Sequence, residues 1–302
     1  MRIGISVSSS HPSDDPRVGA ANMVARARAA AQADLDSLFV GDHHVTPFAY
    51  YQNSPILGRM LAEWGDKPYG ALYLLPLWHP VVLAEQIATL ASIGDGRFIM
   101  QCGLGDARQG DAMGIDMSKR VGMFEASLGT MRALWAGESV DEPRYWNIRG
   151  ASIAPLPAQP VDVWIGSVAQ PAIHRTARLG DGWLAAPSLT PDEAADSLSS
   201  FRQACAEFDR SPTAVAIRRD IFVGATREQA QSVVAPYVDA GYRGMNPDAL
   251  MYGSAEEVAE QMAVFEQQGY TDVIVRNLSS NQGESLATIE RLAEVKSILD
   301  RA

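Results

Sequence analysis

Short apolar runs alternate along the chain with longer segments in which apolar residues recur every three or four positions. An apolar run of about four to eight residues is typical of a buried strand, and the longer spacing is typical of an amphipathic helix. The alternation therefore predicts consecutive βα units with a parallel sheet. The predicted strands are Ile3–Ser8, Ser37–Val40, Ala71–Leu75, Phe98–Cys102, Val163–Ile165, Trp183–Ala186, Ala216–Val223 and Asp272–Arg276.

The segments between these strands carry helix signals. Val18–Ala33 is rich in alanine, Pro80–Ser92 opens with a proline, and Ser118–Trp135 repeats apolar residues three and four apart. Proline is favoured in the first turn of a helix. Thr190 and Thr226 are candidate N-cap residues. Each is followed three positions later by a residue whose side chain can bond back to the cap, Glu193 and Gln229 respectively, which indicates a helix start.

Eight βα units favour a closed (β/α)8 TIM barrel in one domain over residues 1–302, although an open doubly wound sheet has the same repeat. Three segments are longer than ordinary connections and predict insertions at the C-terminal face: Thr46–Tyr69, Gly137–Asp162 and Asp239–Gly253. Within the second, Val140–Ile148 alternates as a short hairpin does. The third is a candidate lid over the barrel mouth.

Composition narrows the class of protein. The chain has 302 residues, of which 47% are hydrophobic and 20% charged, so it can bury a sizeable core and is neither disordered, collagen-like nor a coiled coil. The net charge of −11 opposes binding to nucleic acid or to an anionic membrane. The N-terminus enters a strand directly, and no run approaches the roughly 18 apolar residues of a membrane span. We therefore expect neither export nor a membrane role.

The two cysteines, Cys102 and Cys205, lie far apart and predict neither a disulfide framework nor a metal site. A reducing cytoplasm fits this cysteine usage best.

Ligands of a parallel barrel bind where the strands end, and the second predicted strand ends in Gly41-Asp42-His43-His44. Successive strand residues face opposite sides, so we expect only one of the two histidines to face the barrel axis, and the pair not to share a metal ion. We take this residue to be His43, as a proton donor or hydrogen-bond partner of a ligand. A structural histidine is the alternative.

Glycines follow two other strands. Gly103-Leu104-Gly105-Asp106 lets the backbone approach a ligand, but it lacks the complete GxGxxG pattern, and a plain turn is an equal alternative. Gly166-Ser167 precedes a predicted helix start near Ala169, where a phosphate or an ordinary serine cap would fit. Arg218, Arg219 and Arg276 are candidates to neutralise an acidic ligand, or paired charges.

No serine-histidine-aspartate elbow, phosphate-binding Walker loop, HExxH motif or paired-carboxylate signature occurs in a convincing context, which disfavours a hydrolase. The set of glycine-rich strand ends instead suits a ring-shaped cofactor with a phosphate, which would supply redox chemistry that side chains lack.

Several stretches resemble the bacterial luciferase-like flavin-dependent oxidoreductases and follow in that family's order. They are Phe39–His44, Leu72–Pro80 with Ala84–Gln86, Gly94–Phe98, Met131–Gly137, Trp164–Gly166, Ala177–Trp183 and, weakly, Gly253–Glu257. The resemblance covers most of residues 1–190. It implies a TIM barrel, usually a homodimer, that holds FMN or the deazaflavin F420 at its C-terminal mouth.

The resemblance also implies roles for individual residues. His43 matches a histidine beside the reactive part of the flavin ring that assists proton transfer, and Asp42 matches its acidic neighbour. Gly166 and Ser167 match the phosphate-binding turn. Ala71, Leu72 and Tyr73 match the third-strand end, where members often have a non-proline cis peptide beneath the ring, here Ala71–Leu72 or Leu72–Tyr73.

Positions where this chain differs from the family's sequence pattern bear on the choice between FMN and F420. Gly103 and Leu104 stand where luciferase has a cysteine and an arginine, so long-aldehyde luminescence is not expected. The region Gly103–Asp106 is closer to the F420-using branch, whereas Leu74–Leu77 and the two histidines, His43 and His44, are closer to FMN-using monooxygenases. The net charge of −11 opposes the acidic tail of F420 and favours FMN, unless arginines such as Arg175, Arg178 or Arg218 gather near the mouth.

The sequence thus predicts an FMN-dependent monooxygenase that oxidises a small organic substrate with O2 and with reduced flavin from a separate reductase. F420-dependent hydride transfer is the first alternative. A flavin-binding protein without turnover is a second, and an unrelated TIM-barrel hydrolase is a third.

Overall fold

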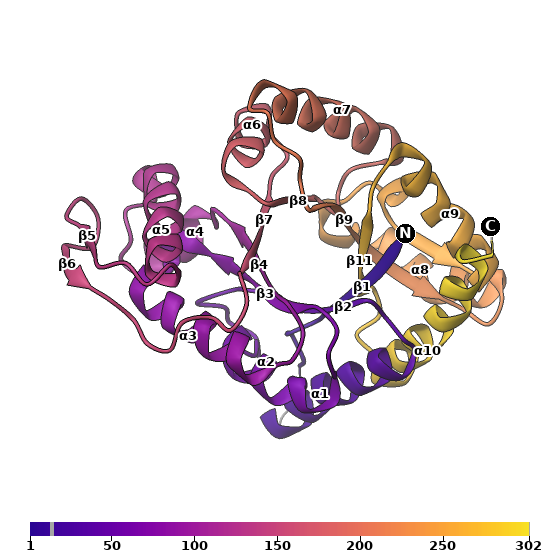
Figure 1. Cartoon of the computed structure of the whole chain (residues 1–302). Coiled ribbons are helices and arrows are strands. Elements are labelled where there is room, and N and C mark those ends of the chain that lie inside the picture. The colour runs from indigo at the N-terminus through magenta and orange to yellow at the C-terminus, as the bar shows by residue number, and fades with distance from the viewer. Residues whose placement is uncertain (13–14, 302) are drawn as a thin grey trace.

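Eight parallel strands surround the centre of the molecule, and helices cover them on the outside (Figure 1). The computed structural model describes residues 1–12 and 15–301. The strands of the ring are β1 (Arg2–Val7), β2 (Ser37–Val40), β3 (Tyr69–Leu74), β4 (Phe98–Gly103), β7 (Asp162–Gly166), β8 (Gly182–Ala185), β9 (Ala214–Val223) and β11 (Asp272–Asn277).

The ring is closed. The strand order β9-β11-β1-β2-β3-β4-β7-β8 returns to its start because β8 also pairs with β9, from Gly182 opposite Ala214 to Ala185 opposite Ile217. Every neighbouring pair is parallel. The predicted (β/α)8 TIM barrel is therefore confirmed, and the open doubly wound sheet is excluded.

The helices follow the strands as predicted, and their starts use the expected caps. Thr190 and Glu193 form a reciprocal capping box, and the Thr226 side chain accepts a hydrogen bond from the Gln229 backbone. The helices are α1 (Pro16–Gln32), α2 (Asn53–Met60), α3 (Pro80–Ile93), α4 (Ala107–Ala112), α5 (Arg120–Trp135), α6 (Gln170–Leu179), α7 (Pro191–Glu207), α8 (Arg227–Asp239), α9 (Ala255–Gln268) and α10 (Gln282–Leu299).

Two layers of apolar side chains form the core. Alternate strand residues point inward and fill the ring, namely Phe39, Ile99, Trp164, Ala214, Ala216 and Ile274. The residues between them point outward and pack under the helices, as Ile3, Ile5 and Val7 of β1 do. Because side chains plug the ring, a ligand can enter only beyond the strand ends.

The three long segments carry extra elements. Thr46–Tyr69 contains α2, and Gly137–Asp162 contains the antiparallel hairpin of β5 (Val140–Glu142) and β6 (Ile148–Ala151), which Figure 1 shows beyond α5. Asp239–Gly253 ends in β10 (Met251–Gly253), which pairs with the end of β9. The hairpin prediction is confirmed.

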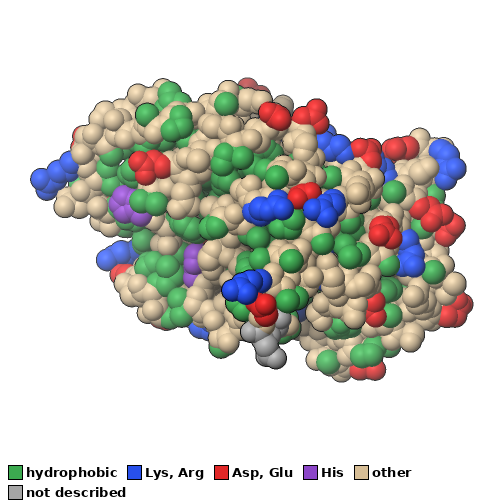
Figure 2. Space-filling view, turned by 90° about the horizontal axis from the view of Figure 1, so that it is seen from below, with side chains coloured by type: hydrophobic (Ala, Val, Ile, Leu, Met, Phe, Trp, Pro, Cys, Tyr) green, Lys and Arg blue, Asp and Glu red, His purple; other side chains and the backbone are tan. Residues whose placement is uncertain are grey.

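Charged side chains are interspersed over the face shown in Figure 2, where the basic residues form no continuous stripe. Across residues 1–12 and 15–301, no helix combines the length and the apolar character needed to cross a bilayer.

Candidate functional site

Two adjoining cavities open at the carboxyl ends of the strands. The first has a volume of about 600 Å³ and the second about 370 Å³, and both are lined by Leu72 and Arg218. The first lies over the ends of β1, β2 and β11, and it contains His43. The second lies over the ends of β4, β7 and β8 and contains Gly166. Together they offer a continuous surface for a large ligand.

Asp42 is a buried anchor beneath the first cavity, with 7% of its surface exposed. Its Oδ2 accepts hydrogen bonds from the Leu74 backbone and from Trp78 Nε1, both at 2.8 Å. Its Oδ1 lies 3.1 Å from His44 Nε2. Asp42 therefore ties the end of β2 to the end of β3, and it directs the His44 side chain away from the mouth.

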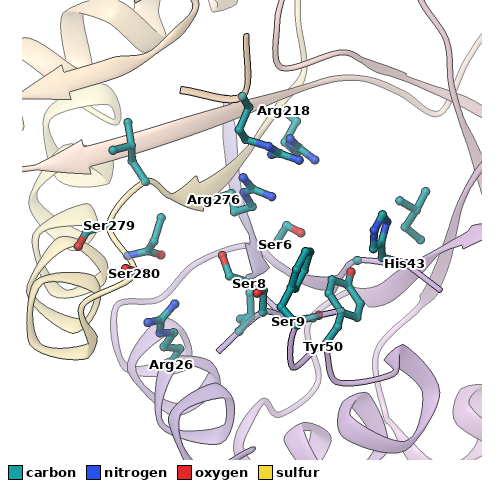
Figure 3. Close-up of a pocket in the computed structure, with 18 of the residues that line it drawn as sticks. Ser6, Ser8, Ser9, Arg26, His43, Tyr50, Arg218, Arg276, Ser279 and Ser280 are labelled. Carbon is teal, nitrogen blue, oxygen red and sulfur yellow. The ribbon is translucent and has the colours of Figure 1, made fainter. Parts of the chain in front are cut away.

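His43 lines the first cavity and is half-buried. Its ring stacks on Phe48 at a centroid distance of 6.3 Å and lies 5.6 Å from the Tyr50 ring. Figure 3 shows Tyr50 next to His43 on this side of the cavity. Burial raises the pKa of Tyr50 to about 12, so its hydroxyl stays protonated.

Arg108 fixes the protonation state of His43. Its Nη2 lies 3.0 Å from His43 Nε2. A guanidinium can only donate, so Nε2 must be the unprotonated nitrogen of a neutral ring. Burial and the charge of Arg108 lower the pKa of His43 below 6.5, which agrees with this assignment. His43 is therefore a neutral proton acceptor at physiological pH.

The short helix α4 clamps the segment that follows His43. Arg108 Nη1 donates to the Val45 carbonyl at 3.3 Å, and Gln109 Oε1 accepts from the His44 backbone at 2.7 Å. Val45 has a φ of 48°, which costs a β-branched residue of the order of 1–3 kcal/mol. Contacts from α4 thus hold a strained backbone beside His43.

The second cavity suits a flat apolar group with a phosphate at one end. Its lining is mostly apolar, with Leu104 and Ile165 among its walls. A Cβ built on Gly103 or Gly166 would meet no protein atom closer than 3.5 Å, so these glycines leave space open in the cavity. A larger side chain at either position would occupy the room that a ring needs.

Polar groups gather at the α6 end of this cavity. Ser167 is buried, and its hydroxyl accepts from Thr176 Oγ1 at 2.9 Å. No side chain caps α6, and Arg175 also lines the cavity. The helix dipole and the guanidinium both favour an anion here. Arg178, by contrast, pairs with Glu125 at 3.0 Å and does not reach the lining.

The third strand, β3, places only one of its three expected ligand-contacting residues in the cavities. Leu72 lines both cavities, but Ala71 and Tyr73 are fully buried on the outer side of β3, because side chains alternate along a strand. The Tyr73 hydroxyl lies 3.1 Å from Ser54 Oγ. Among the described residues the single cis peptide is Ala154–Pro155, so both candidate bonds, 71–72 and 72–73, are trans. Only Leu72 of these three presents its side chain to a ligand.

The turn after β4 is mainly structural beyond Leu104. Gly105 has a φ of +73°, a conformation that glycine adopts without strain, and it packs against Leu74 and Leu77. The Asp106 carboxylate caps α4 by accepting from the Gln109 backbone at 3.0 Å, and it also accepts from the Gln109 side chain. Asp106 thereby positions Gln109 instead of lining either cavity.

Arginines crowd the mouth around one buried carboxylate. Asp220 on β9 is fully buried, and its Oδ2 accepts from Arg276 Nη2 at 2.9 Å and from the Tyr242 hydroxyl at 2.9 Å. Arg243 and Arg218 lie 3.4 and 3.6 Å from the same carboxylate. Burial raises the pKa of Asp220, but these guanidinium groups outweigh it and hold that pKa below its ordinary value. Three arginines against one aspartate leave the mouth positively charged.

Tyr242 and Arg243 come from the third long segment and line the first cavity. This segment therefore reaches the mouth, as expected for a covering segment. Among the described residues, no three histidine, cysteine or carboxylate side chains are grouped closely enough to hold a metal ion.

Sequence reasoning missed Arg26, Ser9, Arg108 and Gln109. An arginine on the apolar face of an alanine-rich helix was the one available signal for Arg26. Arg108 and Gln109 are two residues of an ordinary polar stretch, and nothing in their spacing indicates contact with His43 and His44.

A family model described as luciferase-like monooxygenase matches residues 1–270. The F420-dependent glucose-6-phosphate dehydrogenase of Beutenbergia cavernae is 31% identical over 166 residues, which are 51% of this chain and 49% of that protein. The chain thus matches about half the length of this relative.

Two solved structures share the fold over nearly the whole chain. An F420-dependent secondary alcohol dehydrogenase with an F420-acetone adduct has a TM-score of 0.81 at 18% identity, covering 99% of this chain and 98% of that one. The oxygenating constituent of 3,6-diketocamphane monooxygenase from Pseudomonas putida, with FMN, has a TM-score of 0.81 at 17% identity, covering 97% of both chains.

Proposed function

This chain belongs to the luciferase-like monooxygenase family, and we propose that it is an F420-dependent oxidoreductase that interconverts an alcohol and a carbonyl compound. The observation that carries the proposal is the gathering of arginines at the mouth of a chain with a net charge of −11. Arg175 and Arg218 line the second cavity, and Arg218, Arg243 and Arg276 line the first.

In the sequence, the net charge of −11 favoured FMN because it opposes the acidic tail of F420. The arginines at the mouth remove this objection to F420. A focused positive potential attracts an anionic ligand even when the whole protein is acidic. Burial lowers the pKa of Arg218 only to about 10, so this arginine stays charged at neutral pH. The acidic tail of F420 would find complementary charge at the mouth. The sequence relative named as F420-dependent supports the same choice.

The residues present fit this cofactor. The open space above Gly103 and Gly166 would take the ring, and Ser167 with Arg175 would hold the phosphate. When bound, the deazaflavin would supply a hydride acceptor or donor. Leu72, where the cavities meet, would exclude water from the reacting carbon.

His43 would move the proton. Its unprotonated Nε2 would accept the hydroxyl proton of an alcohol as the hydride leaves the adjacent carbon, and it would return that proton in the reverse direction. Arg108 is exposed, so a substrate hydroxyl could take its place as donor to Nε2. Phe48 and Tyr50 would hold the imidazole in plane beside the substrate.

An FMN-dependent monooxygenase is the second candidate. The α6 end of the second cavity has the anchors for a single phosphate, in Ser167 and Arg175, and the rest of that cavity is largely apolar. In that case these residues would hold FMN supplied in reduced form by a separate reductase, and the bound flavin would supply oxygenation chemistry toward an organic substrate. A homodimer remains an expectation for either candidate.

Competitive binding tests the choice of cofactor. Purified protein is titrated with F420 and with FMN, and we expect F420 to bind at least about tenfold more tightly, with an affinity that falls as salt screens the mouth. Gly166→Leu should weaken F420 binding at least about tenfold with stability changed by less than about 0.5 kcal/mol, whereas Gly129→Leu on the outer helix α5 should leave F420 affinity unchanged. Tighter binding of FMN would overturn the proposal.

Arg108→Gln tests the assigned state of His43. Loss of the guanidinium removes a positive charge that lowers the pKa of His43, so that pKa should rise toward its ordinary value. The acid limb of kcat/KM against pH should therefore move to higher pH, because His43 loses its acceptor form earlier as pH falls. The assay is F420 reduction with glucose 6-phosphate or 2-propanol as probe alcohols. Arg149→Gln, on the distant hairpin, should not move the limb, and an unmoved limb in Arg108→Gln would refute the assignment.

A further inference from the structure

We infer that Arg26, Ser9 and the first turn of α10 form a subsite for an oxyanion of the substrate, with phosphate as the best match. This inference rests on the proposed function, because it names the class of alcohol that would react beside His43. The subsite lies at the end of the first cavity that is formed by the β1 and β11 strand ends.

Arg26 is a buried cation that no carboxylate of residues 1–12 and 15–301 pairs with. It lies on the inner face of α1 with 1% of its surface exposed. Its Nε donates to Gln282 Oε1 at 2.8 Å, but within the described part of the chain its Nη2 has no hydrogen-bond partner. Burial lowers the pKa of Arg26 to about 10, so the guanidinium remains charged at neutral pH. An unpaired buried charge is costly and calls for an anion.

A second buried polar group lines the same cavity. Ser9 has 4% of its surface exposed, and among the described residues its hydroxyl makes no hydrogen bond of normal geometry, although the Tyr50 hydroxyl lies close enough to interact with it. Ser279 and Ser280 complete this end of the lining and lead directly into α10. Figure 3 shows the Arg26 guanidinium between the Ser8–Ser9 side and the Ser279–Ser280 side. Guanidinium and hydroxyl donors thus converge on one space.

The N-terminus of α10 adds an electrostatic field that favours an anion at this subsite. α10 has 18 residues and begins at Gln282, the residue that also binds Arg26. The positive end of its dipole favours an anion, and barrels often bind phosphate after their last strands. The acid in the first turn, Glu284, accepts a hydrogen bond from the Ser279 hydroxyl, which leaves Ser280 and Ser9 as hydroxyl donors to a ligand.

The position of Arg26 assigns the oxyanion to the substrate instead of the cofactor. Arg26 and His43 line the same cavity and, in Figure 3, lie on opposite sides of Ser9 and Tyr50. Arg26 does not line the second cavity, where the cofactor phosphate is proposed to bind. One ligand could therefore place its oxyanion at Arg26 and its hydroxyl at His43.

Inorganic phosphate is the probe for this subsite. In protein saturated with F420, whose phosphate would occupy the anchors at Ser167 and Arg175, phosphate at constant ionic strength should raise the Tm and bind with a measurable Kd by calorimetry. Arg26→Met should weaken phosphate binding at least tenfold, and it should fold because it removes a buried charge and keeps an apolar stem. Arg28→Met is the matched control, since Arg28 on the same helix is exposed and pairs with Glu63 at 2.9 Å. Arg26→Lys, which keeps the charge, should retain most of the affinity.

Three results would overturn the inference: wild-type protein that binds no phosphate, Arg26→Met protein that binds it as tightly as the wild type, or competition between phosphate and bound F420. The last would assign the site to the cofactor tail. F420 binding by the same proteins separates this inference from the proposed function. Wild-type protein that binds F420 but not phosphate contradicts the subsite alone, whereas absence of F420 binding contradicts the proposed function and with it the substrate assignment.

Discussion

Replacing His43 by alanine is expected to lower kcat/KM for F420 reduction by the probe alcohols by about 10²- to 10⁴-fold. Among the described residues that line the first cavity, His43 is the only imidazole, and its Nε2 is held unprotonated, so its loss leaves the hydroxyl proton without this acceptor. The Kd for F420 should change little, because the apolar walls and the phosphate anchors lie in the second cavity. Steady-state turnover and F420 titration measure the two quantities separately.

His79→Ala is the control for this variant. His79 is exposed before α3 and makes no side-chain cap, so its removal should leave both quantities within about twofold. A His43→Ala enzyme that turns over as fast as the wild type would show that His43 has no role in proton transfer. Equal losses of turnover and of F420 affinity would instead make His43 a cofactor-binding residue.

The second large effect is expected at Asp42, where the change is in stability. Asp42→Ala removes the acceptor of two buried donors, the Leu74 N–H and Trp78 Nε1–H, and the partner of His44. Leaving such groups unpaired should lower the free energy of unfolding by about 3–5 kcal/mol. Asp42→Asn keeps an acceptor oxygen and should cost less.

Denaturant unfolding measures this effect. Asp66→Ala is a suitable comparison, because Asp66 is exposed in the loop before β3 and should change the free energy by less than about 0.5 kcal/mol. If Asp42→Ala were as stable as Asp66→Ala, the view of Asp42 as the tie between the second and third strand ends would be wrong.

The strands were predictable because each is a continuous apolar run, buried on both faces, between turn residues. All eight lie where they were predicted, with ends shifted by at most two residues, as for β3, which begins at Tyr69. Closure was less certain from the sequence, since a barrel and an open sheet share the βα repeat. The pairing of β8 with β9 decides it, and it depends on strand tilt and stagger that no local pattern encodes.

Site residues were predictable where the alternation of side chains along a strand decides which residue faces the cavity. Alternation along β2 correctly separates His43, which faces the cavity, from His44, which turns to Asp42. The same rule, applied to β3, would have left only Leu72 of the three expected residues at the mouth, since Ala71 and Tyr73 must face the helices. The resemblance named all three because it marks a segment and does not distinguish the faces of a strand.

Tertiary contacts explain what the sequence could not predict. Arg108 reaches His43 across 65 positions of sequence, and Arg26 reaches Gln282 across 256. The positive mouth likewise arises from arginines on two strands and one loop around Asp220. Net charge describes the whole surface and carries no information about such a local excess.

A crystal structure of the protein with oxidised F420 tests the central claim most directly. The account predicts the ring above Gly103 and Gly166 with its reactive carbon toward His43, and the phosphate at Ser167 and Arg175. A ring bound outside the two cavities, or a cofactor phosphate seated on Arg26, would contradict it.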